Sequence, residues 1–133
     1  MRLRPHLTFD GKCQAAFLRY QQVFGGSLMV LTYGESPMAA SVDAEWHDRV
    51  VHATLRFDEE ELAGADVLPR DYRKPQGLFV LVSVEGLAKA ERIFASLAEG
   101  GEVQLPFQKA FWSEGFGVLV DAFGVPWEIS TES

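Results

Sequence analysis

Three side chains carry most of the chemistry that this sequence offers: the imidazoles of His6 and His52 and the carboxylate of Glu128. Each lies in a run where apolar and polar residues alternate, so each is expected to project from a strand, away from its apolar neighbours. Imidazole and carboxylate groups act as general acids or bases, or as hydrogen-bond partners for a ligand. His52 and Glu128 are therefore the catalytic candidates, and all three residues are candidates for ligand binding.

The stretch around Glu128 predicts two strands joined by a tight turn. Residues 115–121 and 125–130 alternate, and residues 121–124 begin with Asp and end with Gly, which favours a turn. In the second strand Trp127 and Ile129 point to one side and Glu128 to the other. The carboxylate therefore either faces water or projects into a cavity that uses its charge.

Two aromatic residues are candidates for lining a pocket. Trp46 ends a loop rich in Gly, Pro and Ser, residues 34–46, and Phe79 lies on the polar side of an apolar strand, residues 78–84. Simpler interpretations stay open for the histidines, since His6 fits a half-exposed strand position and His52 fits a hydrogen bond to a neighbouring loop. Trp112 and Trp127 fit packing in a core or a dimer contact.

The cationic side chains and the single cysteine offer other chemistry. An anionic ligand would be attracted by five of them: Arg4, Arg56, Arg70, Arg73 and Lys74. Residues 70–74 fit a solvated loop equally well. Cys13 begins a predicted helix, where an exposed thiol would have a lowered pKa, but no base is adjacent in the sequence, so a nucleophilic role is not favoured. A lone cysteine forms no internal disulfide, which agrees with a reducing cytosol.

Composition excludes several classes of protein. The chain has 133 residues, a net charge of -7 and 47% hydrophobic residues, which is typical of one globular domain and unfavourable for a nucleic-acid groove. No apolar run is long enough to span a membrane, and the first residues contain no apolar signal region. We therefore expect a cytoplasmic protein that contacts neither nucleic acid nor membrane. Phosphate loops, GxSxG elbows, CxxC pairs and HExxH helices are missing from the sequence.

Hydrophobic periodicity predicts the order β-α-β-β-β twice, an α+β fold in a single domain, 1–133. Module one covers about residues 2–67 and module two about residues 77–131. The predicted strands are 3–9, 27–33, 50–57, 62–67, 78–84, 102–110, 115–121 and 125–130, and the predicted helices are 12–24 and 87–98. A shift of 75 positions relates the modules, carrying Leu7 to Val82, Phe9 to Val84, Ala15 to Ala90, Leu18 to Ile93 and Gly25-Gly26 to Gly100-Gly101.

One helix per module covers one face of its sheet, so the opposite face must meet another module, a partner chain or a ligand. Two curved sheets that face one another would leave a cleft suited to a small molecule. The residues expected on these open faces are His6, Thr8, His52, Thr54, Phe79, Leu81, Ser83, Glu128 and Ser130.

Several short motifs spread over the chain match a known family. They are Phe9-Asp10-Gly11, Phe17 to Tyr20, Val23 to Gly26, Val51-His52-Ala53, Asp66, Phe111-Trp112, Phe116-Gly117 and Asp121 to Trp127. With these motifs the chain resembles the vicinal oxygen chelate superfamily (glyoxalase I, bleomycin-resistance proteins and extradiol dioxygenases), and more narrowly its PhnB-like branch. The resemblance implies curved mixed sheets around a cleft with helices outside, and usually a homodimer. It implies no single reaction.

Metal-dependent members of that superfamily hold a divalent metal with residues on the first and last strand of each module. Glu128 falls at the last-strand position of module two, and Asp66 is the candidate in module one. At the first-strand positions the repeat points to Phe79, which cannot ligate, and to Arg4, with His6 two residues further on. The ligand set is incomplete, so a divalent metal stays an open alternative, with His6 and Glu128 as its ligands and His52 as a further candidate.

Three functions follow from these expectations. The first is binding of an unidentified small molecule in the cleft, without a complete metal site. The second is a metal-dependent enzyme of glyoxalase or dioxygenase type, with the metal as Lewis acid. The third is a drug-sequestering protein of bleomycin-resistance type, with a dimer groove lined by aromatic side chains.

Overall fold

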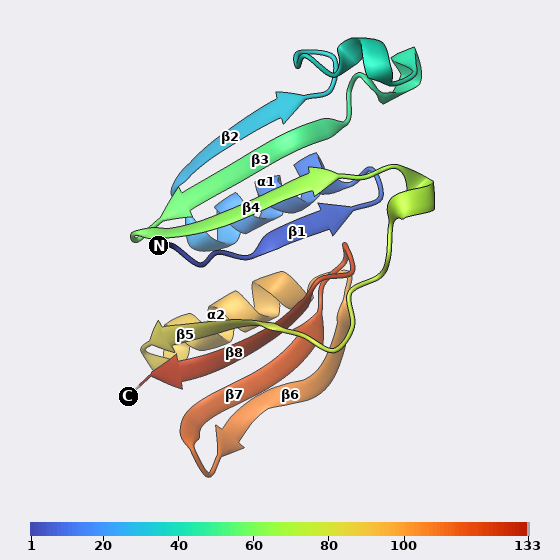
Figure 1. The fold of residues 1–133 in the computed structure, drawn as a ribbon. Helices are drawn as coiled ribbons and strands as arrows, with labels where there is room; N and C mark the ends of the chain where they lie inside the picture. The colour runs from blue at the N-terminus through green and yellow to red at the C-terminus, as the bar shows by residue number, and fades with distance from the viewer. Residues whose placement is uncertain (133) are drawn as a thin grey trace. The chain divides into compact units, whose positions relative to one another are not determined.

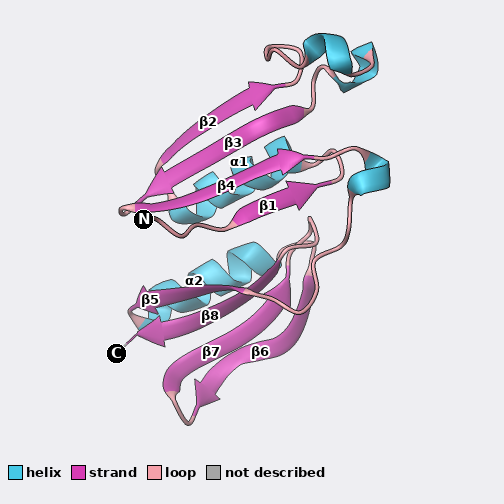
Figure 2. Cartoon of the chain, viewed as in Figure 1, coloured by secondary structure: helices cyan, strands magenta, loops and turns pink. Residues whose placement is uncertain are grey.

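The computed structural model describes residues 1–132, which form two compact units, Met1–Arg73 and, from Lys74 onward, the rest of the chain (Figure 1). Each unit runs strand, helix and three further strands, as the colouring by secondary structure in Figure 2 shows. The predicted α+β class and the repeated β-α-β-β-β order are confirmed. Each unit is described by itself below.

Unit 1 contains a four-stranded sheet with the strand order β1-β4-β3-β2. The first and last strands, β1 and β4, pair in parallel, and the other pairs are antiparallel. Between β2 and β3 the chain forms two short 3₁₀ turns, and a third turn follows β4. The elements are β1 (His6–Phe9), α1 (Cys13–Phe24), β2 (Ser27–Thr32), η1 (Ala39–Ser41), η2 (Ala44–Trp46), β3 (Val50–Phe57), β4 (Glu60–Asp66) and η3 (Pro69–Asp71).

Unit 2 repeats this topology with the strand order β5-β8-β7-β6. Here β5 and β8 pair in parallel, and β6, β7 and β8 are joined by antiparallel pairing. The elements are β5 (Val80–Glu85), α2 (Leu87–Ala98), β6 (Glu102–Ala110), β7 (Ser113–Val120) and β8 (Pro126–Glu132). Asp121 and Gly124 close the β7–β8 turn, with an N–H···O bond of 3.1 Å, as predicted.

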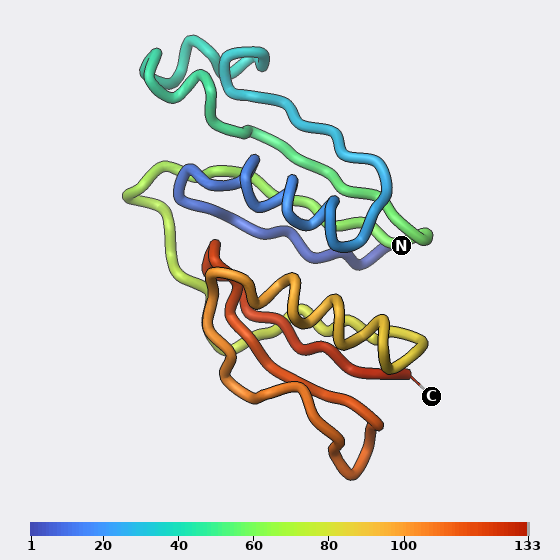
Figure 3. Tube along the Cα trace, turned by 180° about the vertical axis from the view of Figure 1, so that it is seen from behind, coloured from blue at the N-terminus to red at the C-terminus, as the bar shows by residue number. Residues whose placement is uncertain are grey.

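A single helix covers one face of each sheet. In Figure 1 each helix lies behind the strands of its own unit, and the reverse view of Figure 3 shows it in front of them. The side chains buried between helix and sheet are Leu7, Phe9, Ala53, Leu55, Leu62, Ala16, Phe17 and Tyr20 in unit 1, and Val84, Leu119, Trp127, Ile129, Ala90, Ile93, Phe94 and Leu97 in unit 2. The opposite face of each sheet is open within its unit, and strand alternation decides which residues lie on it.

Three details of the sequence interpretation are wrong. The first strand begins at His6 rather than at residue 3, because Leu3 lies outside the sheet and is fully exposed. The charged turn expected at residues 59–61 lies at Asp58 and Glu59, which both have positive φ, and Glu61 already belongs to β4. A non-glycine residue adopts positive φ at a steric cost, so a pair of such residues has no simple sequence signal.

The third error concerns the helices. Phe9 and Val84 are equivalent, as the shift of 75 positions predicts, because each is the buried strand residue opposite the end of the last strand. The buried helix positions 13, 16, 17 and 20, however, correspond to 90, 93, 94 and 97, a shift of 77. Leu18 is consequently exposed, whereas its expected equivalent Ile93 is buried.

The buried carboxylate of Asp66 fastens three elements of unit 1. Its Oδ1 accepts the N–H of Cys13 at the start of α1 (3.0 Å), and its Oδ2 accepts the N–H of Val50 at the start of β3 (2.9 Å). Its backbone oxygen accepts the hydroxyl of Tyr33 (2.7 Å). Lys12, the residue before the helix, provides no capping side chain. Asp66 therefore caps α1 from a distant strand, and its charge suits the helix N-terminus.

Replacing Asp66 by alanine should lower the free energy of unfolding by about 2 to 5 kcal/mol, because two buried N–H groups lose their acceptor. Urea unfolding followed by circular dichroism measures the change. The matched control is Asp71→Ala, which removes an exposed carboxylate and should change stability by less than about 0.5 kcal/mol. Equal effects of the two substitutions would contradict the capping role.

Candidate functional site

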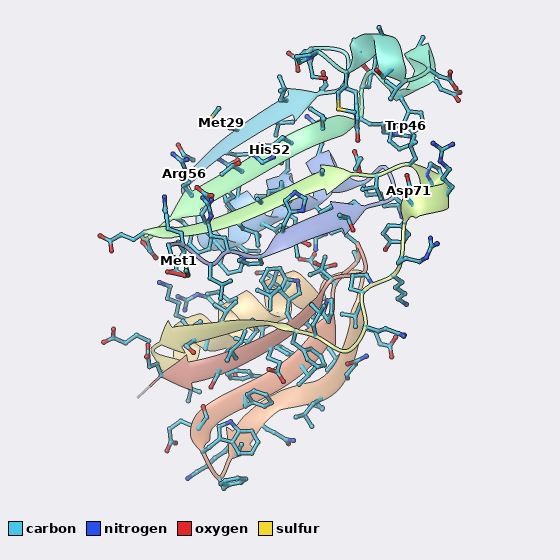
Figure 4. The ribbon with its side chains drawn as sticks, viewed as in Figure 1. Met1, Met29, Trp46, His52, Arg56 and Asp71 are labelled. Atoms are coloured by element: carbon cyan, nitrogen blue, oxygen red, sulfur yellow. The ribbon has the colours of Figure 1, made fainter. Side chains whose placement is uncertain are left out.

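On the open face of unit 1, two histidines approach each other across a floor of alanine. His6 on β1 lies opposite Ala63 on β4, and Thr54 on β3 lies opposite the same alanine. The ring centroids of His6 and His52 are 6.5 Å apart, with 29° between the ring planes. Ala63 has no side chain beyond Cβ, which leaves space for the two imidazoles above it. Figure 4 labels His52 together with Met29 and Arg56 on this face, turned away from α1.

His52 has a hydrogen-bond partner on its own strand. Its Nε2 lies 3.0 Å from the Thr54 hydroxyl oxygen, which acts as donor or acceptor depending on the tautomer. The expected alternative, a bond from His52 to a neighbouring loop, is not the contact found. Both imidazoles are exposed, and His52 lies opposite the exposed Leu31 on β2, with Met29 next along that strand on the same face, so this face combines proton-transfer groups with an apolar surface.

The arginines on the same face are already engaged. Arg56 donates from Nε to Oε1 of Glu61 (2.7 Å), and Arg4 contacts the other oxygen of that carboxylate. The hydrogen bond from Arg56, and then the charges of the two arginines, hold the pKa of Glu61 below its ordinary value. An anionic ligand would compete with Glu61 for these guanidinium groups. The pairing therefore argues against the expectation that Arg4 and Arg56 attract an anionic ligand.

Trp46 lies in the loop between β2 and β3, where it packs edge-on against Tyr33 with ring centroids 5.8 Å apart. The guanidinium of Arg49 lies over its ring at 5.7 Å. The neighbouring His47 fastens the same loop, with Nε2 at 2.9 Å from the oxygen of Ala39. These contacts hold the loop together, and they give Trp46 a packing role that its sequence position did not reveal.

On the open face of unit 2, Glu128 stands between apolar neighbours. Its strand β8 pairs with β5 and β7, so that Glu128 lies opposite Leu81 on one side and Val118 on the other. Val118 in turn lies opposite Leu105 on β6. Leu81 and Leu105 are both exposed apolar side chains. A half-buried carboxylate thus occupies the middle of an otherwise apolar row of residues.

Within the described residues, the Glu128 carboxylate has neither a hydrogen-bond partner nor an ion-pair partner. The contrast with Glu61 and with the buried Asp121 is clear. Asp121 accepts the Trp127 indole N–H (2.9 Å) and the N–H groups of Phe123 and Val125. Glu128 is therefore the one of these three carboxylates whose charge is not used by its own unit.

Beside Glu128 the same sheet carries a hollow of about 300 Å³. Its lining is formed by the segment that leads into β5 and by the ends of three strands: Lys74, Pro75, Gln76, Gly77, Leu78, Phe79, Glu102, Gln104, Val120 and Pro126. Of these residues the sequence analysis named Phe79 as a lining residue. The polar side chains of Gln76, Glu102 and Gln104 were missed. Glu102 and Gln104 lie on β6, which only the pairing of the whole sheet brings to the same hollow as Phe79, and Gln76 lies in the segment before β5.

Strand pairing corrects the positions that the family resemblance assigned to metal ligands. In unit 2 the first-strand residue opposite Glu128 is Leu81, not Phe79. The equivalent pair in unit 1 is His6 with Ala63, so the first-strand residue is His6 itself rather than Arg4. Asp66 is excluded as a ligand because its side chain is buried on the helix side and caps α1.

Within residues 1–132 no cluster of three or more His, Cys, Asp or Glu side chains is positioned to hold a metal ion. Neither helix of this part of the chain is long and apolar enough to cross a membrane.

Trp127 is buried against α2, as a packing role requires, whereas Trp112 is exposed at the β6–β7 turn, where it contacts Phe111 and Phe116.

Comparison with known proteins decides the family. The chain is 31% identical to Protein YjdN of Escherichia coli (strain K12) over 139 residues, which covers 98% of this chain and 95% of YjdN. The crystal structure of PA1353 from Pseudomonas aeruginosa is 38% identical, with a TM-score of 0.91 over 99% of this chain and 98% of that one. The PhnB protein from Bacillus cereus superposes with a TM-score of 0.82 at 22% identity, over 99% and 100% of the two chains.

The chain belongs to the same family as Protein YjdN. Its fold is that of the vicinal oxygen chelate superfamily, which the PhnB protein and glyoxalase/bleomycin resistance/dioxygenase structures share at lower identity. No protein-family model matches the sequence. The fold leaves the reaction open, so the function is argued below from the residues.

The Phe116-Gly117 motif, one of those that carry the resemblance, has a packing reason. A Cβ added at Gly117 would lie 2.6 Å from the ring of Phe94 on α2, so only glycine lets the helix approach β7 this closely. This motif therefore reports the helix–sheet contact, and its Phe116 lies on the open face next to the row of Glu128.

Cys13 should be unreactive in the folded protein. The thiol is fully buried, and burial together with the charge of Asp66 raises its pKa far above the ordinary value, so almost no thiolate forms. Alkylation by iodoacetamide at pH 8 should proceed about a hundredfold more slowly than in urea, as mass spectrometry will measure. Rapid labelling of the native protein would contradict the buried position.

Proposed function

We propose that the protein binds a small organic molecule on the open faces of its sheets, without a complete set of metal ligands. The observation that carries the proposal is Glu128, a half-buried carboxylate that has no hydrogen-bond or ion-pair partner among residues 1–132 and has exposed apolar side chains around it. A carboxylate that its own unit does not use, among apolar side chains on an open face, is available to a ligand, which favours a role in binding. The ligand's chemistry is argued in the next subsection.

The donor chemistry argues against the divalent metal that the fold family implies. The first-strand and last-strand positions hold His6 and Ala63 in unit 1, and Leu81 and Glu128 in unit 2. Alanine and leucine have no donor atom, and catalytic zinc sites commonly use three protein ligands. The residues at these four positions therefore do not fit the family's metal.

A second candidate, a metal-dependent enzyme of glyoxalase or dioxygenase type, is favoured by one observation. His6 and His52 lie within stacking distance on an open face, and neutral imidazole is a common metal ligand. The drug-sequestering alternative belongs to the first candidate, since it is binding without turnover. Metal content separates the two candidates.

Protein purified without a metal-affinity tag should contain less than about 0.1 equivalents of Ni, Zn, Fe and Mn together, because two donors do not retain a metal through purification. Inductively coupled plasma mass spectrometry makes the measurement, with Glu128→Gln and His6→Gln as companion variants. Stoichiometric metal that disappears in either variant would favour the enzyme over the proposal.

Binding itself can be tested with N-benzylacetamide, a neutral molecule with one aromatic ring. In ¹H–¹⁵N spectra it should shift the amide signals of Leu81, Val118 and Glu128 equally with and without EDTA. Leu81→Ser should weaken this binding about fivefold, because an apolar contact is lost. The control is Leu87→Ser, which changes a comparably exposed leucine on α2 and should leave the affinity unchanged.

The homodimer that the resemblance implies is part of the same proposal, as is a cytoplasmic location. The exposed Phe111 and Trp112 at the β6–β7 turn are apolar side chains that a contact between two copies would cover. Light scattering after size exclusion at micromolar concentration should give twice the mass of one chain, which is 14.8 kDa. A stable monomer would remove the shared dimer groove.

A further inference from the structure

We infer that the molecule bound on the open face of unit 2 is an organic cation with a flat apolar body. Its positive nitrogen lies against the Glu128 carboxylate, and its ring lies in the hollow beside Phe79. The inference rests on the proposed function, since it names the class of ligand that this face selects. Three observations lead to it: the unpartnered charge, the aromatic neighbours and the charge balance of the hollow.

The first observation is the environment of the carboxylate. Glu128 on β8 lies opposite Leu81 on β5 and opposite Val118 on β7. Neither of these direct neighbours can donate a hydrogen bond from its side chain. A partly desolvated carboxylate in apolar surroundings is destabilised until an opposite charge approaches it. A cation on the ligand supplies that charge, and its apolar part covers Leu81 at the same time.

The second observation is the position of two phenylalanines. Phe116 lies opposite Ser130, two residues from Glu128, so its ring occupies a diagonal position on the neighbouring strand. Phe79 comes two residues before Leu81, the residue opposite Glu128, so it lies diagonal to Glu128 on the side away from Phe116. Aromatic faces attract ammonium groups, most strongly where water is partly excluded. A cation beside Glu128 therefore has an aromatic residue on each side.

The third observation is the balance of charge in the hollow. The hollow is lined by apolar side chains, among them Phe79, Val120 and Pro126, by the neutral amides of Gln76 and Gln104, and by one cationic and one anionic side chain, Lys74 and Glu102. These two charges cancel, so Glu128, about 7 Å further along β8, decides the sign. A volume of about 300 Å³ accommodates one aromatic ring with its substituents. The net charge of -7 adds long-range attraction for cations.

Three probes with a common benzyl body test the inference: benzyltrimethylammonium, N-benzylacetamide and phenylmethanesulfonate, which are cationic, neutral and anionic. Each is titrated into the ¹⁵N-labelled full chain, and dissociation constants are taken from the amide signals of β5, β7 and β8. The cation should bind at least about threefold more tightly than the neutral probe, and the anion most weakly. Added NaCl should weaken binding of the cation only.

Two variants isolate the carboxylate. Glu128→Gln keeps the shape and removes the charge, so it should weaken binding of the cation about five- to tenfold and leave the neutral probe within about twofold. Glu91→Gln removes one charge from the exposed side of α2 and should change neither. This pair separates a local contact from the effect of net charge.

The outcomes distinguish the two proposals. If the neutral probe binds and the cation binds no better, or if Glu128→Gln leaves the cation unaffected, the organic-cation inference is overturned while the proposed function stands. If the cation shifts only signals outside β5, β7 and β8, the organic-cation inference is also overturned. If none of the three probes shifts the signals of this face, the proposed function itself is overturned.

Discussion

The parallel pairing of the first and last strand in each unit is the constraint on which the candidate site depends. It forces the chain to cross over through a helix before the remaining strands are added, and the helix then covers the face on which it crosses. The same pairing fixes the register, Leu81 with Glu128 and His6 with Ala63. The antiparallel registers of β3 with β4 and of β7 with β8 then add Thr54 and Val118 as neighbours.

Equivalent positions on the two open faces have taken different chemistry. Where unit 1 has His6, Ala63 and Thr54, unit 2 has Leu81, Glu128 and Val118. On the open face of unit 1, Glu61 lies one row away from these residues and is neutralised by Arg4 and Arg56. On the open face of unit 2, Glu128 has no such partner within the described residues. The duplicated backbone thus presents imidazole and paired charge on one sheet, and an isolated carboxylate among apolar groups on the other.

Alternation in the sequence predicted which residues lie on the open faces, and it did so for His6, His52, Leu81 and Glu128 alike. Periodicity cannot predict which residues lie opposite one another, so the repeat pointed to Phe79 as the first-strand position of unit 2, whereas the strand pairing puts Leu81 opposite Glu128. Interactions between residues far apart in the sequence also could not be predicted from it. Asp66 caps a helix that begins 53 residues earlier, and a loop residue and a capping residue look alike in one sequence.

The helix alignment failed for a related reason. The buried strand residue and the first buried helix residue are two positions further apart in unit 2, Val84 to Ala90, than in unit 1, Phe9 to Cys13. The paired glycines after each helix conceal this difference, because they keep the shift of 75 positions. Only the buried pattern of Ala90, Ile93 and Phe94 against Cys13, Ala16 and Phe17 reveals it. Burial is a property of packing, so the sequence repeat alone aligned the wrong faces of the two helices.

An unsatisfied polar group does not by itself indicate a binding site, as Thr131 illustrates. Its hydroxyl is buried and has no hydrogen-bond partner among residues 1–132, and it occupies the position in unit 2 that corresponds to Asp66 in unit 1. There it lies on the helix-covered side of the sheet, where no ligand can reach it. Glu128 is three residues earlier on the same strand and therefore on the other side, open within its unit and beside a hollow. Both residues leave a polar group unpaired, but only at Glu128 can a bound molecule offset the cost, and this difference in access is what makes its carboxylate a candidate for function.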